Sequence, residues 1–158
     1  MPELDSTDIR ILRMLQTEGR MPLTKLSGFL NIPHTTVRDR IRRMEEAGVI
    51  DGYETVINLA KVGFHVLAFV MVTLDQRVDI AKAVEALMDM DEVSETYLPT
   101  GDIDILVRIS AKDVAHLRHI LYQKFNSIPG LIRTNTVIVL DSQSKPTQLP
   151  LANLEPDR

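Results

Sequence analysis

The stretch NIPHTTVRDRIRRMEEAG, residues 31–48, decides the fold of the N-terminal part of the chain. Its Asn-Ile-Pro start makes a tight connection, and a helix follows that ends at Gly48. At about 100° per residue, one side of that helix carries the apolar residues Val37, Ile41 and Met44. We therefore expect this side to be buried and the opposite, arginine-rich side to face solvent.

Two further helices are expected before this stretch. The first begins after Asp5, a residue type that caps helices, and ends at Gly19. Its apolar stripe consists of Ile9, Leu12 and Leu15, with Ile11 alongside. The second covers about residues 22–30, and its inward residues are Leu23, Leu26 and Leu30. Three short helices with a tight turn between the second and third are typical of a helix-turn-helix.

The rest of the chain alternates between strand-like and helix-like segments. The strands are expected at residues 66–74, 93–98, 103–109 and 134–140. One helix follows the first strand, with an apolar face of Ile80, Ala83, Val84, Leu87 and Met90. Another follows the third strand, with an apolar face of Val114, Leu117, Leu121, Phe125 and Ile128. The βαββαβ order predicts an α+β ferredoxin-like sandwich with both helices on one face of the sheet.

The segment between these two parts is expected to be extended. Residues 53–59 suit a strand, and residues 60–64 suit a hinge. The predicted organisation is a helix-turn-helix domain over residues 1–52, a strand and hinge linker over 53–64, and a ferredoxin-like domain over 65–158.

The strand at 66–74 is apolar on both of its sides, although a sheet with one wet face should alternate. Leu106 and Val139 also fall on the face opposite to their alternating neighbours. A domain of this size has no third layer of its own to cover that face. We therefore predict a homodimer in which a second copy of the sheet covers it.

The composition excludes several classes of protein. The 158 residues include no cysteine, so there is no disulfide framework, thiolate metal site or cysteine nucleophile. No apolar run approaches the roughly 18 residues needed to cross a bilayer. The N-terminus is acidic and does not resemble a signal peptide, so we expect a cytoplasmic protein without membrane contact.

The net charge of −4 is unevenly distributed. Residues 1–52 carry eight basic and eight acidic side chains, and residues 53–158 carry ten and fourteen. Within residues 35–43, four arginines accompany a single acid, Asp39. This pattern argues against loose coating of nucleic acid, but it is compatible with a localised DNA-reading surface.

The outward face of the third helix offers hydroxyl, guanidinium and carboxylate groups, which read base edges and phosphates. The predicted DNA-binding residues are His34, Thr35, Thr36, Arg38, Asp39, Arg42 and Arg43. The alternative is a solvated helix face, which a helix-turn-helix context makes less favoured. Arg40 lies nearer the buried stripe, so we predict that it pairs with Glu45 or with an acid on a neighbouring helix.

The other candidate sites have simpler explanations. His116 and His119 share a helix face but lack further ligands, so no metal site is predicted. Asp102 and Asp104 have no nucleophile or histidine nearby in sequence, so no catalytic pair is predicted. There is no glycine-rich phosphate loop. We expect no catalytic residues and no cofactor, and hence no enzyme.

Several motifs, in their order and spacing, resemble the Lrp/AsnC family over nearly the whole chain. They are Leu4-Asp5-x-x-Asp8-x-x-Ile11-Leu12, Gly19-Arg20, Val37-x-x-Arg40-Ile41-x-x-Met44-Glu45-x-x-Gly48-Val49-Ile50-x-Gly52-Tyr53, Gly101-Asp102-Ile103-Asp104, Pro129-Gly130 and Lys145-x-x-x-Leu149-Pro150-Leu151. The resemblance implies a winged helix-turn-helix joined to a RAM-type sensing domain. It also implies dimers that build tetramers or octamers, and amino-acid effectors bound between dimers.

By this resemblance, the effector site lies beside the loop at residues 100–104. The predicted effector-binding residues are Tyr97, Leu98, Thr100, Gly101, Asp102, Ile103 and Asp104. Tyr97 also suits plain cross-strand packing. The chain departs from the family where Ile32-Pro33 replaces the usual Leu-Ser. Proline cannot cap with a side chain, so Asn31 is expected to cap the third helix.

These observations predict a sequence-specific transcriptional regulator that binds a pseudo-palindromic double-stranded DNA operator and responds to an amino acid or a related metabolite. The alternative is a metabolite-binding or assembly module without sequence-specific DNA binding. A small enzyme on the ferredoxin-like fold is a third and weaker possibility.

Overall fold

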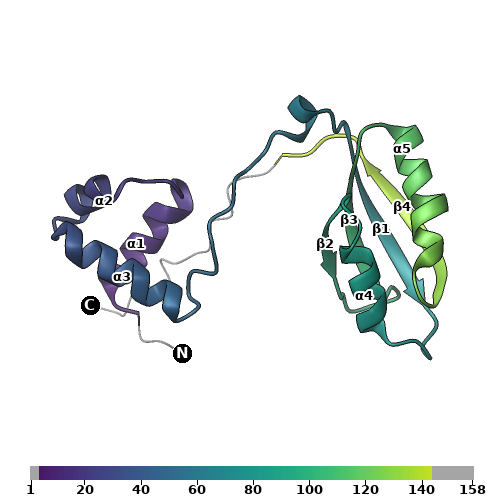
Figure 1. The fold of residues 1–158 in the computed structure, drawn as a ribbon, viewed down its shortest axis with the longest axis horizontal. Helices are drawn as coiled ribbons and strands as arrows, with labels where there is room; N and C mark the ends of the chain where they lie inside the picture. The colour runs from purple at the N-terminus through teal and green to yellow at the C-terminus, as the bar shows by residue number, and fades with distance from the viewer. Residues whose placement is uncertain (1–3, 144–158) are drawn as a thin grey trace. The chain divides into compact units, whose positions relative to one another are not determined.

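The structure is a computed structural model that describes residues 4–143 (Figure 1). Two compact units divide between Val56 and Ile57, inside the predicted 53–64 connection. The family-like motif at residues 145–151 and the C-terminal end of the predicted 65–158 domain lie outside the described residues. In the described part, no helix is long and apolar enough to span a bilayer.

Among its described residues, the N-terminal unit has three helices: α1 (Ser6–Thr17), α2 (Leu23–Leu30) and α3 (His34–Glu46). A reciprocal capping box begins α1, as the Asp5 carboxylate accepts the Asp8 N–H at 2.9 Å and the Asp8 carboxylate accepts the Asp5 N–H at 3.1 Å. The core of this unit consists of Ile11, Leu26, Leu30, Val37, Ile41 and Met44. The inward face predicted for α3 is therefore confirmed.

The prediction that Asn31 caps α3 is wrong. Asn31 instead ends α2 in the left-handed conformation, with φ 55° and ψ 44°, and its N–H bonds to the Ser27 carbonyl. Asparagine tolerates this conformation better than most residues, which suits it to the end of a helix. Pro33 directly precedes α3 and supplies no side-chain cap.

The strand predicted over residues 53–59 is also wrong. Residues 51–58 form no regular element, and a short 3₁₀ helix, η1 (Leu59–Val62), follows them. A strand needs a hydrogen-bonded partner, and the described residues offer this segment none. Val56 is accordingly 97% exposed.

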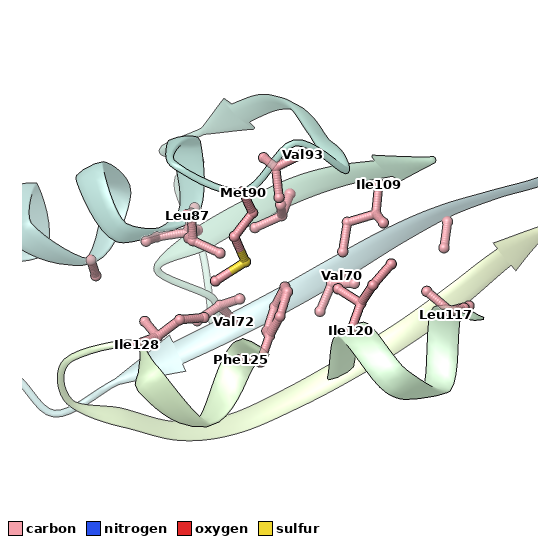
Figure 2. Packing of buried hydrophobic residues seen from close by; sticks show 14 of the residues in the cluster. Val70, Val72, Leu87, Met90, Val93, Ile109, Leu117, Ile120, Phe125 and Ile128 are labelled. Atoms are coloured by element: carbon pink, nitrogen blue, oxygen red, sulfur yellow. The ribbon is translucent and has the colours of Figure 1, made fainter. Parts of the chain in front are cut away.

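The C-terminal unit is a four-stranded antiparallel sheet with helices packed on one face, in the predicted βαββαβ order (Figures 1 and 2). Its strands are β1 (Val66–Leu74), β2 (Val93–Tyr97), β3 (Ile105–Ala111) and β4 (Leu131–Val139), in the spatial order β2-β3-β1-β4. Its helices are α4 (Ile80–Met88), α5 (Val114–His119), η2 (Ile120–Lys124) and η3 (Phe125–Ser127). Each pair of neighbouring strands is antiparallel.

The core of this unit lies between the helices and the sheet. Figure 2 shows Phe125 and Ile120 pointing from the helical layer toward Val70 and Val72 on β1. Alternate residues of β1 and β3 fill the sheet side, namely Ala68, Val70, Val72, Leu74, Ile105, Val107, Ile109 and Ala111. Successive side chains of a strand point to opposite sides of the sheet, so every second residue of β1 and β3 faces the helices.

Both predicted helix faces need correction, and on α4 the residue that differs is Ile80, which is exposed. Val114 is 60% exposed, and Ile120 rather than Leu121 is fully buried. The chain makes a π turn over η2, so Ile120 and Phe125, five residues apart, both point inward. The regular α-helical period of 3.6 residues does not predict this spacing of five residues between inward side chains.

The opposite face of the sheet is apolar as well, as expected. Leu67, Phe69 and Met71 alternate with the buried residues of β1 and are only partly covered. The strand register places Arg108 and Val137 on either side of Phe69. We refer to this surface, made by Leu67, Phe69, Met71, Tyr97, Leu106, Arg108, Val137 and Val139, as the open sheet face.

Candidate nucleic-acid interface and effector pocket

The outward side of α3 presents the residues predicted to contact DNA. His34, Thr35, Arg38, Asp39, Arg42 and Arg43 are exposed, and Thr36 is half-buried. Their presentation follows from the burial of Val37, Ile41 and Met44 on the other side of the same helix. The surface therefore combines hydrogen-bonding hydroxyls with four guanidinium groups when Arg40 is included.

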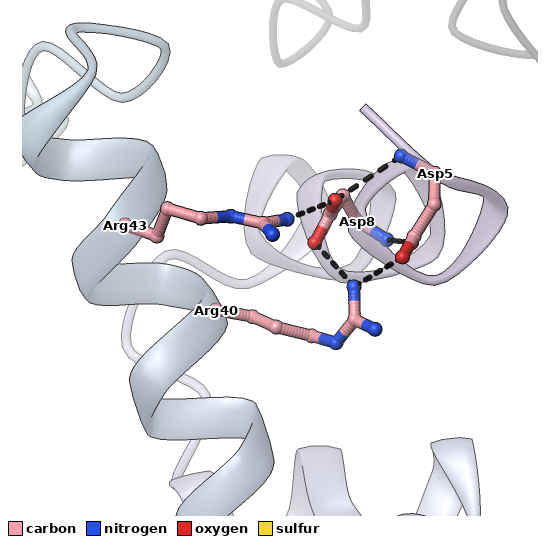
Figure 3. A network of polar contacts seen from close by, with 4 residues as sticks. All are labelled: Asp5, Asp8, Arg40 and Arg43. Atoms are coloured by element: carbon pink, nitrogen blue, oxygen red, sulfur yellow. Dashed lines mark hydrogen bonds and ion pairs between the residues drawn. The ribbon is translucent and has the colours of Figure 1, made fainter. Parts of the chain in front are cut away.

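Asp8 connects α3 to the first turn of α1 (Figure 3). It is fully buried, and it is the one charged side chain that is buried among residues 4–143. Its Oδ1 accepts from Arg40 Nη1 at 2.9 Å, and its Oδ2 accepts from Arg43 Nη2 at 2.5 Å. A buried carboxylate needs such partners, so Asp8 fixes both arginines to α1.

Arg40 therefore has the structural role that we predicted. Its Nη1 also donates to Asp5 Oδ2 at 2.6 Å, so the partners are acids of a neighbouring helix. Glu45, the alternative partner, instead accepts from the Tyr53 hydroxyl at 3.0 Å. Burial and this hydrogen bond to Glu45 raise the pKa of Tyr53 to about 12.

The carboxylate of Asp5, the N-cap residue of α1, also interacts with Arg40. Burial alone would raise the pKa of Asp5, but hydrogen bonds from Arg40 and from the Asp8 backbone outweigh it. The pKa of Asp5 therefore lies below its ordinary value of 3.8. The hydrogen bonds to Asp5 and Asp8 raise the pKa of Arg40 in turn.

The other two arginines of α3 pair with exposed acids. Arg42 Nε donates to Glu46 Oε1 at 2.7 Å, one helical turn away, and Arg38 Nε lies 3.5 Å from Asp39 Oδ1. The hydrogen bond to Glu46 raises the pKa of Arg42. Sequence reasoning did not find the pairing of Arg43 with Asp8, because no local pattern links residues 35 positions apart.

A cavity of about 200 Å³ lies on the open-face side of the sheet, beside the loop between β2 and β3. It is lined by Met71, Thr73, Asp102, Ile103, Arg133 and Asn135. The register pairs Thr73 with Arg133 and Met71 with Asn135, so β1 and β4 form its floor. Of the predicted effector residues, Asp102 and Ile103 line this cavity. The β1 and β4 residues were missed, because strand register is not readable from one sequence.

Asp104 holds the loop in place instead of lining the cavity. Its carboxylate accepts the Leu74 N–H at 2.7 Å, and its own N–H donates to the Val72 carbonyl at 2.9 Å. The loop residues Asp102 and Ile103 are thereby fastened beside β1.

The remaining predicted effector residues, Tyr97, Leu98, Thr100 and Gly101, do not line this cavity either. The Tyr97 hydroxyl donates to Glu95, which also accepts from Arg108 Nη1 at 2.9 Å. Tyr97 thus takes part in a polar cluster next to the apolar part of the open sheet face.

His116 of α5 is held by local contacts. His116 Nδ1 accepts the Lys112 N–H at 3.2 Å, and its Nε2 lies 3.5 Å from Glu92. Across the described residues, no group of three or more histidines or acids is arranged to hold a metal ion.

Comparisons with known proteins match both units. The winged helix-turn-helix DNA-binding family matches residues 4–51, and the Lrp/AsnC ligand binding domain matches residues 67–149. HTH-type transcriptional regulator FL11 of Pyrococcus abyssi is 33% identical over 148 residues, which cover 94% of this chain and 97% of that protein.

Two solved structures share the fold over nearly the whole chain. A transcriptional regulator from Neisseria meningitidis in complex with L-methionine has a TM-score of 0.91 at 26% identity, covering 96% of this chain and 99% of that one. E. coli AsnC has a TM-score of 0.84 at 27% identity, covering 92% and 98%. The two matched domains and the whole-length relative lead to one conclusion: the chain belongs to the Lrp/AsnC family of DNA-binding transcriptional regulators and is not an enzyme.

Proposed function

We propose that this regulator reads a specific duplex sequence through the outward face of α3, and that a small amino acid bound in the C-terminal unit modulates the binding. The observation that carries the proposal is the arginine and threonine surface of α3, held on α1 by the buried Asp8. A helix so anchored presents base-reading groups in a fixed orientation. The similar regulators come from prokaryotes, whose DNA lies in the cytoplasm, so we propose that this protein acts there.

We propose that α3 enters the major groove. Its exposed arginines suit guanine O6 and N7, and Thr35 suits a thymine methyl or a phosphate. Asp39 suits the amino group of a cytosine. A dimer presents two such helices, so the operator is expected to be pseudo-palindromic, with half-sites about one helical turn or a multiple of it apart.

The open sheet face supports a homodimer. Phe69 and Met71 at its centre are apolar and only partly covered, and a second copy of the same face is the partner of matching chemistry. Phe69→Asp places a charge in that contact. We expect this variant to sediment as a monomer, whereas the surface variant Arg118→Ala keeps the wild-type mass. Assembly of dimers into tetramers or octamers is a further prediction.

The cavity has the chemistry to bind a zwitterion. The Asp102 carboxylate suits an α-ammonium group and the Arg133 guanidinium suits an α-carboxylate, while Met71 and Ile103 offer apolar contacts to a side chain. Its volume of about 200 Å³ suits a ligand of amino-acid size. L-methionine, which is bound to the Neisseria meningitidis regulator, is the first probe.

DNA recognition is tested by genome-wide pull-down with the purified full chain at two salt concentrations. We expect discrete peaks that share a two-fold motif and that are lost in Arg42→Ala. Arg118→Ala removes an exposed arginine of α5 and serves as the matched control. Diffuse binding that salt erases, without a motif, would show that α3 is not a sequence reader.

Effector binding is tested by calorimetric titration with each of the twenty amino acids. We expect binding by methionine or leucine, weakened about tenfold or more in Arg133→Gln and Asp102→Asn, which each lose one charge-assisted hydrogen bond. Unchanged DNA affinity and assembly across all twenty amino acids would contradict the sensing role.

A further inference from the structure

The four arginines of α3 are held by carboxylates in two different ways. Arg40 and Arg43 donate through their terminal nitrogens, Nη1 and Nη2, to the buried Asp8. Arg42 instead donates through Nε, on the side of the guanidinium, to Glu46. Arg38 approaches Asp39 through Nε too, at the longer distance of 3.5 Å.

This difference determines which terminal nitrogens remain available to bind a base. A guanidinium recognises guanine by donating two parallel hydrogen bonds to O6 and N7. In Arg42 the hydrogen bond to Glu46 uses Nε, and neither Nη1 nor Nη2 donates a hydrogen bond to a carboxylate among the described residues. In Arg40 and Arg43 a terminal nitrogen is already committed to a carboxylate that water does not reach.

The Glu46 carboxylate also acts against non-specific contacts. A phosphate that approaches Arg42 meets the negative charge of Glu46, whose Oε1 lies 2.7 Å from Nε, and this charge weakens the attraction of the phosphate to the guanidinium. A guanine edge carries no net charge, and it can accept two hydrogen bonds from the terminal nitrogens while Nε stays bonded to Glu46. The pair therefore favours base contact over phosphate contact.

We propose that Glu46 is a positioning residue for DNA reading, which orients the Arg42 guanidinium through Nε so that its two terminal nitrogens bind one guanine. This inference rests on the proposed DNA-reading role of α3. Both side chains are largely exposed, at 75% for Arg42 and 62% for Glu46, so the pair forms and breaks freely and its effect on affinity is moderate. Its effect is on selectivity.

The experiment measures the ratio of operator affinity to random-duplex affinity for the full-length protein, by fluorescence anisotropy across a salt series. The operator is the one obtained from the wild-type pull-down. In Glu46→Ala we expect random-duplex affinity to rise and the ratio to fall by about two- to fivefold, the range for one exposed ion pair. Glu46→Gln keeps an acceptor for Nε but loses the charge, so its ratio lies between those of the wild type and Glu46→Ala.

Two controls separate orientation from total charge. Glu45→Ala removes the same charge one position away, but Glu45 bonds to Tyr53 and not to an arginine. Its ratio is expected to stay close to that of the wild type. In an Arg42→Ala background, Glu46→Ala should raise random-duplex affinity less than it does in the wild type, because the guanidinium that Glu46 pairs with is absent.

The outcomes are distinguishable. A wild-type protein without any operator preference would overturn the proposed reading function and this inference with it. A selective wild type whose ratio is unchanged in Glu46→Ala, or is equally reduced in Glu45→Ala, would overturn the role of Glu46 alone. Circular dichroism of each variant at the assay temperature verifies that α3 is folded in every comparison.

Discussion

Arg40 Nη1 lies 2.9 Å from Oδ1 of Asp8, so α3 is tied to a carboxylate that is fully buried at the start of α1. Removing one member of such a pair leaves guanidinium charge against a cavity. We expect Asp8→Ala to lower the free energy of unfolding of the N-terminal unit by on the order of 3 kcal/mol.

Urea denaturation followed by helical circular dichroism measures this loss. Asp39→Ala, which breaks only an exposed pair, is the control and should change the free energy of unfolding by less than about 0.5 kcal/mol. Equal effects of the two substitutions would mean that Asp8 does not connect α1 and α3.

Asp5 makes the stability of the N-terminal unit depend on acid pH. Burial opposes ionisation of Asp5, but the hydrogen bonds from Arg40 and the Asp8 N–H outweigh burial and lower the folded-state pKa. The folded state therefore favours the ionised form. The resulting stability is fully present above the ordinary pKa of 3.8 and is lost as the pH falls through the lower folded value.

Comparing wild type with Asp5→Asn over a pH series tests this linkage. The difference in unfolding free energy between the two proteins should be constant above about pH 5 and should shrink below about pH 4. A difference that grows on acidification would mean that the folded state raises the pKa of Asp5 instead of lowering it.

Gly130 is required at the turn before β4. Its φ is 71°, and a Cβ there would lie 2.5 Å from Cγ2 of Val78. We expect Gly130→Ala to cost about 2–4 kcal/mol of unfolding free energy, from backbone strain and overpacking together. Thermal or urea unfolding of the C-terminal unit measures this loss of unfolding free energy.

Gly48→Ala isolates the backbone part of that cost. Gly48 has a φ of 64°, but open space surrounds the position of its Cβ, so only about 1–2 kcal/mol is expected. Adding Val78→Ala to Gly130→Ala should recover part of the packing cost. No recovery in the double variant would show that the contact with Val78 is not the cause.

Asp104 does not line the cavity, but it holds the loop whose residues do. Asp104→Ala removes the acceptor of the Leu74 N–H and frees the loop that carries Asp102 and Ile103, so amino-acid affinity is expected to fall about tenfold. Asp104→Asn keeps an acceptor oxygen and should retain most of the affinity. Calorimetric titration with methionine distinguishes this arrangement from direct contact, in which both variants would lose binding alike.

Sequence periodicity predicted the buried residues correctly in elements that bury one regular face. The inward side of α3 and the alternating core face of β1 follow directly from spacings of about 3.6 and two residues. The arginine surface on α3 was predicted for the same reason, since fixing Val37 and Ile41 inside places Arg38 and Arg42 outside.

The features that escaped sequence analysis depend on contacts between distant residues. The segment at 53–59 has strand-like composition, but a strand also requires a partner for its hydrogen bonds. The π turn at η2 inserts one residue between Ile120 and Phe125, which no periodic template anticipates. The Arg133 side of the cavity depends on the register between β1 and β4.

The two hydrophobic cores have no residue in common: one is built from α1, α2 and α3, and the other from the sheet and its helices. The side chains that pack in one core are therefore not those that pack in the other. Under the proposed function, a lineage can change the exposed face of α3, and so the operator, by substitutions that leave every residue of the second core unchanged. The same separation predicts that N-terminal units can be exchanged among relatives, with retained effector binding as the expected outcome.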